Sequence, residues 1–267
     1  MFPLEIRLWS ITKHFALAVH RRAFLVLEHF FGLLRFVVWA PIVSARLPRL
    51  LRGLDRDMHR PTSRFLGSER ILLQYINLPE RSDRRREFES ELSKFDFVRP
   101  VRIIATPDSN GSLGCAKSHV DALTQFLNSS EDVTIICEDD VEFVGSPKEI
   151  AAIIDEFESS QLVDVLCLAY RLRGPRLPVS STMAIGNNIQ TTACYVVGRA
   201  AAEAVRENFS KSEQLLAAGI SPRIASIDIR WKSLQFHPLT FAVPRAPMAR
   251  QRESYSDIAK RVKRYDP

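Results

Sequence analysis

In Thr134-Ile-Ile-Cys-Glu-Asp-Asp-Val141, an apolar, strand-like run leads directly into three consecutive carboxylates. Three adjacent acids repel one another and raise each other's pKa unless a positive group lies among them. A divalent cation suits this role because hard carboxylate oxygens bind Mg²⁺ or Mn²⁺ well. The location also fits, since open α/β sheets bind ligands beyond the carboxyl ends of their strands. The alternative is a solvated acidic turn before the next helix, and this stretch alone leaves both interpretations open.

Short apolar runs and helical patterns alternate on both sides of this stretch. We expect buried strands over residues 71–76, 133–137, 163–168 and 191–197. We expect helices over residues 83–95, 114–127, 147–159 and 199–208. Strands that alternate with helices predict an α/β fold with a mainly parallel sheet that helices cover.

The overall composition is typical of globular proteins, with 46% hydrophobic and 25% charged residues in 267. Such a chain can bury a sizeable core, which excludes bulk disorder. Its four cysteines include no Cys-x-x-Cys pair and lie mostly in apolar runs, where a thiol behaves as a small hydrophobe. This pattern predicts a reducing compartment, with neither a disulfide framework nor a zinc cluster.

Basic residues are concentrated at the N-terminus. Residues 1–68 hold 11 Lys and Arg against 4 Asp and Glu, a balance of +7, whereas the other 199 hold 26 against 27, a balance of −1. A basic groove across the main domain is therefore not expected, which argues against nucleic acid as a partner.

The basic N-terminal segment has the pattern of an amphipathic helix. Polar residues recur every seven positions, and the longest apolar stretch, 23–45, is interrupted by Glu28, His29 and Arg35. Each mid-bilayer charge costs roughly 2.5–3.5 kcal/mol, so we expect this helix to lie in a membrane interface. A spanning helix, a signal peptide, and packing on the following domain or a partner chain remain alternatives. We divide the chain into a leader and linker, residues 1–67, and a second domain, residues 68–267.

Six segments in order carry a family resemblance. They are Ile76-Asn-Leu-Pro-Glu-Arg-Ser-Asp-Arg-Arg85, Gly111-Ser-Leu-Gly-Cys-Ala-Lys-Ser-His119, Glu138-Asp-Asp140, Thr192-Ala-Cys-Tyr195, Ile227-Asp228 with Trp231, and Ser256-Asp-Ile258. This series resembles glycosyltransferase family 25, the lipooligosaccharide type of sugar transferase. The resemblance covers roughly residues 70–258 and does not extend over residues 1–68.

The resemblance implies a GT-A-like nucleotide-sugar-binding fold, in which a divalent metal, Mn²⁺ or Mg²⁺, holds the diphosphate of the donor. Metal binding is then expected at Asp140 first and at Asp139 second. The residues expected to bind the donor are Asn77, Arg81, Gly114, Ser118, His119 and Glu138.

Several of these residues also have structural interpretations. Asn77 and Arg81 could merely shape a turn, Gly114 could permit a tight helix entry, and His119 could be a buried structural histidine. For Tyr195, core packing is the favoured interpretation.

The catalytic base is expected to be Asp228, because this acid lies between apolar residues and matches a late aspartate of the family. A metal-ligand role is its other functional option. Glu142 is the reserve candidate for the base, and His237 is a weaker candidate for an additional metal ligand.

The resemblance implies an inverting hexosyltransferase that moves galactose from a UDP-sugar to a lipid-linked surface glycan such as lipopolysaccharide core. UDP-glucose or an N-acetylated analogue remain open as donors. The basic leader predicts a peripheral location at the cytoplasmic face of an anionic membrane. A non-catalytic, membrane-associated binding module with the same fold is the main alternative, and a metal-dependent hydrolase is a further one.

Overall fold

The computed structural model describes residues 71–160, 162–174, 176–236 and 238–252, together with the backbone of 254–256 and 261–263. The predicted leader, residues 1–67, lies outside the described residues, as do His237, Asp257 and Ile258. In the part of the chain that is described, no helix is both long enough and apolar enough to cross a bilayer.

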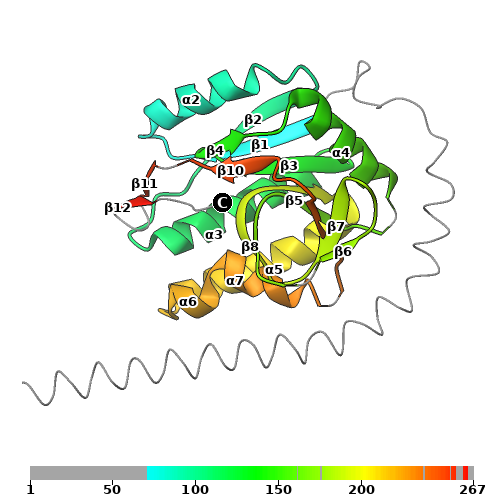
Figure 1. The fold of residues 1–267 in the computed structure, drawn as a ribbon. Coiled ribbons are helices and arrows are strands. Elements are labelled where there is room, and N and C mark those ends of the chain that lie inside the picture. The colour runs from blue at the N-terminus through cyan, green and yellow to red at the C-terminus, as the bar shows by residue number, and fades with distance from the viewer. Residues whose placement is uncertain are drawn as a thin grey trace, which may run out of the picture. The chain divides into compact units, whose positions relative to one another are not determined.

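A single eight-stranded sheet forms the centre of the described domain (Figure 1), and its strand order is β2-β1-β3-β8-β5-β9-β7-β6. The strands are β1 (Ile71–Asn77), β2 (Val98–Ile104), β3 (Val133–Glu138), β5 (Val165–Leu172), β6 (Arg176–Pro178), β7 (Met183–Gly186), β8 (Ile189–Gly198) and β9 (Phe241–Pro244). The α/β fold class predicted from the sequence is confirmed.

Most of this sheet runs in one direction. β1 is parallel to β2 and β3, and β5 is parallel to β9. β8 is antiparallel to both β3 and β5, and β7 is antiparallel to β6 and β9. Within the described residues, six strands therefore point one way, and only β7 and β8 point the other. Just residues 187 and 188 join β7 to β8, which is too short for the crossover that parallel neighbours need. β8 therefore continues in the direction of β7, and the two strands are not neighbours in the sheet.

Helices cover both faces of the sheet. Successive β1 side chains point to opposite faces, and all of the apolar ones are buried, so both faces need cover. Ile71, Leu73 and Tyr75 belong to one hydrophobic cluster, with residues of α2 (Ser82–Leu92) and α4 (Pro147–Ser159). Leu72 and Ile76 belong to the other cluster, with residues of α3 (Gly111–Leu127) and α5 (Arg199–Ala217). Figure 1 shows α2 on one side of the sheet and α3 and α5 on the other.

Local sequence signals account for where α4 begins. Ser146 accepts a hydrogen bond from the Glu149 backbone N–H, and the Glu149 side chain in turn accepts one from the Ser146 backbone, which is a capping box. Pro147 at the first helical position needs no backbone partner. The helix predicted over residues 147–159 has these same bounds in the structure.

Short elements complete the described chain and bring its last part back to the acidic turn. They are β4 (Val141–Phe143), α6 (Pro222–Ala225), α7 (Ile227–Arg230), the 3₁₀ helix η2 (Trp231–Ser233), β10 (Ala249–Gln251), β11 (Ser254–Ser256) and β12 (Arg261–Lys263). β4 pairs with β10, so Gln251 lies opposite Val141. This pairing places residues near 250 beside the three acids, although more than 100 positions separate them in the sequence.

Candidate functional site

The three acids lie where the sequence predicts, at the carboxyl end of a central strand. β3 ends at Glu138, and Asp139 and Asp140 form the turn into β4. β1 is the parallel neighbour of β3 and ends alongside it, with Ile76 opposite Glu138. Asn77, the last residue of β1, therefore reaches the acidic turn directly.

Asp139 is buried in a complete set of polar contacts. Its Oδ2 accepts a hydrogen bond from Asn77 Nδ2 at 2.6 Å, and its Oδ1 accepts one from Arg84 Nη1 at 2.9 Å. Burial raises the pKa of Asp139, and the contacts with Asn77 and Arg84 oppose that rise because they favour the charged carboxylate. The negative charge of Asp139 is thus balanced by a guanidinium within the protein.

Arg84 comes from α2, and the sequence analysis did not assign it to the site. It precedes the buried residues Phe88 and Leu92 by four and eight positions, which puts the three on one helical face. That spacing is the signal in the sequence that predicts an inward-facing Arg84. Arg85, on another face of the helix, forms an exposed ion pair with Glu89.

Asp140 is as buried as Asp139, with 9% of its surface exposed against 7%, but its polar contacts are weaker. Arg84 Nη1 lies 3.6 Å from its Oδ2, and Gln251 Nε2 donates to its Oδ1 at 3.4 Å. Burial first, and then the nearby charge of Glu138, raise the pKa of Asp140 from 3.8 to about 7. This carboxylate lacks a full counter-charge within the described part of the protein.

Asp228 reaches the same region from α7, near the end of the chain. Its Oδ2 accepts a hydrogen bond from Gln190 Nε2 at 3.0 Å, and Gln190 Oε1 accepts one from Lys232 Nζ at 3.4 Å. Burial raises the pKa of Asp228, the Gln190 hydrogen bond and the charge of Lys232 oppose that rise, and the charge of Glu138 adds to it. The structure therefore brings the predicted base, Asp228, within electrostatic range of the acidic turn.

The backbone is strained next to these contacts. Thr191 has a φ of 78° and Asn188 has a φ of 59°. A positive φ is unusual for any residue other than glycine, and for a β-branched residue such as Thr191 it is a true outlier. Thr191 lies beside Gln190, the partner of Asp228, and its hydroxyl donates to Gln251, the partner of Asp140. Strain of this kind gathers at sites where side chains must be aimed.

His119 is fully buried against the acidic turn. Its ring stacks on Tyr195, and its Nδ1 lies 3.2 Å from the Tyr195 hydroxyl. Its Nε2 lies 3.8 Å from Glu138 Oε1, beyond hydrogen-bond reach. Tyr195 has no exposed surface, so the prediction that it packs in the core is confirmed, and its hydroxyl also positions the histidine.

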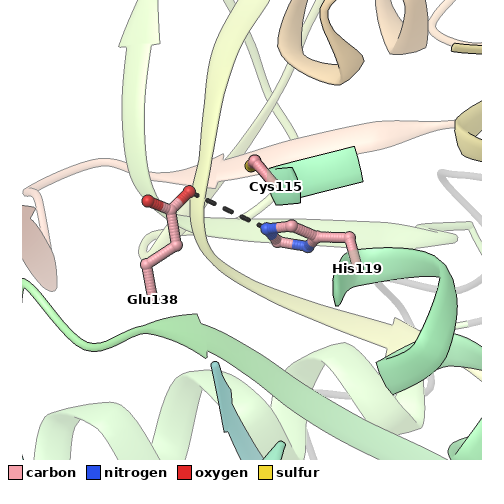
Figure 2. A group of neighbouring side chains, drawn as sticks. All are labelled: Cys115, His119 and Glu138. Atoms are coloured by element: carbon pink, nitrogen blue, oxygen red, sulfur yellow. Dashed lines mark ion pairs between the residues drawn. The ribbon is translucent and has the colours of Figure 1, made fainter. Parts of the chain in front are cut away.

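Cys115 completes a group of metal-ligand types with His119 and Glu138. One ligand atom from each lies within 4.8 Å of the other two, and Figure 2 shows the three side chains converging on one point. The sequence analysis expected no zinc cluster from cysteine spacing. The residues that form this group come from a helix and a strand, so cysteine spacing alone does not reveal it.

Ser118 and Gly114 shape the loop before α3. Ser118 Oγ donates to the Gly114 carbonyl at 2.7 Å and accepts from the Thr106 backbone N–H at 3.0 Å. A Cβ on Gly114 would come within 2.6 Å of the Thr106 carbonyl, so only glycine lets this loop approach. These contacts give both residues a structural role, and their predicted donor-binding role stays a prediction.

The other predicted residues lie around this centre. Arg81 forms an ion pair with exposed Asp83, and its backbone carbonyl accepts a hydrogen bond from Asn77 Nδ2. These contacts connect the turn to the site. Asn77 Oδ1 is buried and has no hydrogen-bond partner among the described residues. Glu142 forms an exposed ion pair with Arg250 on the β4–β10 ribbon, and no described contact joins Glu142 to Asp228.

A divalent cation, which the family resemblance implies, fits Asp140 better than Asp139. Both oxygens of Asp139 already have partners, and one of these partners is a cation. Asp140 has a raised pKa and a negative neighbour in Glu138, the two conditions that a dication relieves. Glu138 is the other carboxylate that would complete the oxygen ligands. Gln251 directs its Nε2 toward Asp140 and its Oε1 toward Thr191, and the sequence motifs did not point to it.

No protein-family model matches the chain. No curated protein matches it. Among solved structures, a glycosyltransferase involved in the glycosylation of the major capsid of PBCV-1 matches with 15% identity and a TM-score of 0.39, over 58% of this chain and 78% of that one. The mannosyltransferase of Pyrobaculum calidifontis, in complex with GDP-Man and Mn²⁺, matches with 10% identity and a TM-score of 0.44, over 85% of this chain and 70% of that one. Both of these neighbours are glycosyltransferases.

Proposed function

We propose that this chain is a metal-assisted, inverting glycosyltransferase with a GT-A-like fold and a family 25 type of site. The observation that carries the proposal is the pair of acids Glu138 and Asp140 at the carboxyl end of β3, together with Asp228, whose pKa the charge of Glu138 raises. Two of these acids, Asp140 and Asp228, have raised pKa values. Buried acids with perturbed pKa values that converge from distant parts of a chain are typical of an active site.

The proposed reaction is one in-line displacement. An acceptor hydroxyl oxygen forms a bond with the anomeric carbon of the sugar while the bond from that carbon to the diphosphate oxygen breaks. Asp228 takes the hydroxyl proton, and burial makes its carboxylate a stronger base than an exposed one. Gln190 holds the Asp228 carboxylate in place through its 3.0 Å hydrogen bond. A cation bound at Asp140 would supply Lewis-acid stabilisation of the diphosphate leaving group.

The donor proposed first is UDP-galactose, and the proposed acceptor is a lipid-linked surface glycan such as lipopolysaccharide core. Asn77 and Arg81 are proposed to contact the nucleotide, which their position at the end of β1 supports. The basic leader would hold the domain at the cytoplasmic face of an anionic membrane.

The second candidate function is a binding module without turnover. The ion pair between Arg84 and Asp139 favours it, because a guanidinium already occupies one side of the acidic turn at 2.9 Å. The weak pairing of Asp140 favours an enzyme instead.

A donor screen tests the proposal. Nucleoside diphosphate release is measured from a panel of UDP- and GDP-sugars with Mn²⁺, with an acceptor glycan present and absent. We expect release from one UDP-hexose, with a loss of about 10²–10⁴-fold in Asp228→Asn. The matched control is Glu207→Gln, an exposed acid on α5. Binding of a nucleotide sugar without release would favour the binding module, and release from Asp228→Asn at the parent rate would exclude Asp228 as the base.

A further inference from the structure

The group formed by Cys115, His119 and Glu138 has the chemistry of a site for a softer cation than Mn²⁺ or Mg²⁺. Cys115 and His119 are four residues apart on α3, so their side chains share one face of the helix. Glu138 faces them from the end of β3, as Figure 2 shows. A thiol and an imidazole are ligands that select Zn²⁺, whereas Mg²⁺ and Mn²⁺ prefer sites made of oxygen.

The distances suit a small tetrahedral ion. Zinc bonds of about 2.0–2.3 Å at tetrahedral angles hold neighbouring ligand atoms roughly 3.3–3.8 Å apart. His119 Nε2 and Glu138 Oε1 are 3.8 Å apart, and all three ligand atoms lie within 4.8 Å of one another. A side-chain adjustment of about 1 Å would bring them all into range. Cys115 and Glu138 are only half-buried, which leaves access for an ion and for a fourth ligand.

A second observation points to a ligand at this place. His119 Nε2 is buried and has no hydrogen-bond partner among the described residues. A buried polar nitrogen without a partner is costly, and a bound ion removes that cost. The Tyr195 hydroxyl oxygen, 3.2 Å from Nδ1, can accept a hydrogen bond from Nδ1–H. In that tautomer Nε2 carries no proton, and its lone pair is directed toward Glu138. Metal-binding histidines usually donate their other ring N–H in this way.

The electrostatic environment supports a cation as that ligand. Burial first, and then the charges of Glu138, Asp228 and Asp140, raise the pKa of the Cys115 thiol well above its usual value. Three carboxylates therefore act on this thiol. A dication reverses this balance, since a thiol that coordinates a metal ion loses its proton.

We propose that Cys115, His119 and Glu138 form a binding site for a thiophilic divalent cation, with Zn²⁺ as the ion that best matches the ligands. The site shares Glu138 with the oxygen ligands expected at Asp140, whereas Cys115 and His119 belong to this site alone, and it does not depend on sugar transfer. Tyr195 is a positioning residue that orients His119 through Nδ1. Glu138 belongs to this group and also to the run of three acids at the end of β3. An ion bound to Glu138 would therefore change the charge that Asp140 and Asp228 experience.

Cobalt absorption tests the site directly, because Co²⁺ replaces Zn²⁺ and absorbs in the near ultraviolet when a thiolate binds it. The full chain is titrated with Co²⁺, and Zn²⁺ affinity is measured by competition with a chromophoric chelator. We expect a thiolate-to-cobalt band in the parent that Zn²⁺ displaces. Cys115→Ser should remove the band and lower Zn²⁺ affinity by more than about 100-fold, beyond the 10–100-fold typical of outer-shell residues. Glu138→Gln should keep the band and weaken affinity.

Two controls separate this site from its neighbours. Asp140→Asn should keep the cobalt band, because Asp140 is not one of the three ligands. Cys137→Ala should also keep it, although Cys137 lies 3.0 Å from the thiol of Cys194 and offers an alternative pair. A band that survives Cys115→Ser, or no band in the parent, overturns the proposal.

A measurement on the parent alone remains decisive if a variant fails to fold. The half-buried thiol of Cys115 is labelled with a maleimide, and the rate is followed by mass spectrometry of its peptide. Only the free thiolate reacts with the maleimide, so Zn²⁺ at about 10 times its dissociation constant should slow this labelling roughly 10-fold, and Mg²⁺ should not. Equal labelling rates with and without Zn²⁺ would overturn the site. Sugar transfer plays no part in either measurement, so a failed donor screen and a failed zinc site are distinguishable.

Discussion

Asp139 and Asp140 are adjacent and almost equally buried, yet the two sides of the acidic turn have different surroundings. On the Asp139 side, Asn77 and Arg84 saturate the carboxylate with short contacts of 2.6 and 2.9 Å. On the Asp140 side, the nearest polar partners lie at 3.4 and 3.6 Å, and the neighbours Glu138 and Cys115 add no positive charge. One acid therefore stabilises the fold, and the other remains available for a ligand.

This contrast explains how the turn can be both stable and chemically active. A buried carboxylate with a guanidinium partner holds α2 against the ends of β1 and β3. A buried carboxylate without a full partner makes the folded state less stable unless a proton or a cation binds it.

Removal of the guanidinium should give the largest loss of stability. Arg84→Ala leaves Asp139 buried without its cation, and breaking a buried ion pair in this way costs about 3–5 kcal/mol. The exposed pair Arg85–Glu89 gives the matched control, since Arg85→Ala should change the free energy of unfolding far less. Urea unfolding measures both. Adding Asp139→Asn to Arg84→Ala should restore part of the loss, and a double variant no more stable than Arg84→Ala would show that the ion pair is not the cause.

Neutralising the other acid should have the opposite sign. The pKa of Asp140 is raised from 3.8 to about 7, so the folded state holds this proton more tightly than the unfolded state. Stability from this group is therefore complete below pH 3.8 and is lost as the pH rises to about 7. Asp140→Asn removes the loss and should stabilise the protein by about 1–4 kcal/mol at pH 8.

The same substitution should change little at pH 4, where Asp140 carries its proton in the folded protein. Thermal unfolding at the two pH values, with Glu207→Gln as a surface control, checks this difference. A gain that is equal at pH 4 and pH 8 would show that the effect comes from packing and not from charge.

The sequence predicted the fold class, the four strands β1, β3, β5 and β8, the helices α2 to α5, and the position of the acids at a strand end. Those features depend on local apolar patterns and on a general rule for open sheets. It did not predict that Arg84 would neutralise Asp139, or that Gln190 and Gln251 would hold Asp228 and Asp140. These contacts join residues 38 to 111 positions apart. Such pairs depend on strand order and register, which no local pattern contains.

The group of Cys115, His119 and Glu138 also depends on a contact between distant parts of the chain. Cys115 and His119 lie one helical turn apart, and this i, i+4 spacing is visible in the sequence. The third member, Glu138, meets them only because β3 ends beside α3 in the folded chain. Spacing between cysteines alone therefore does not reveal a mixed group of this kind.

The stabilisation of the protein by a bound metal should depend on Asp140 more than on Asp139, and this effect on stability should be smaller than the two above. A site that is occupied at 100 times its dissociation constant stabilises a protein by about 2.7 kcal/mol. We expect Mn²⁺ with UDP to raise the unfolding temperature of the parent at pH 8, and to have no effect on Asp140→Asn. Asp139→Asn should retain most of the rise, because Arg84 already occupies that side. Each variant is compared with its own metal-free unfolding temperature, and a rise lost only in Asp139→Asn would reverse the assignment.

The smallest expected effect concerns Gln190 and would sharpen the role of Asp228. The 3.0 Å hydrogen bond from Gln190 Nε2 favours the charged form of Asp228 and opposes the rise in pKa that burial causes. Gln190→Ala removes this bond, so the pKa of Asp228 should rise further. If Asp228 is the base, it must lose its proton before it can act, and the acid limb of the kcat/KM profile should move to higher pH. The plateau at high pH should change little, because the carboxylate is charged there in both proteins. Glu207→Gln is the control, since this exposed acid on α5 makes no described contact with Asp228. A plateau that falls while the limb stays in place would show that Gln190 only shapes β8, and that the base lies elsewhere.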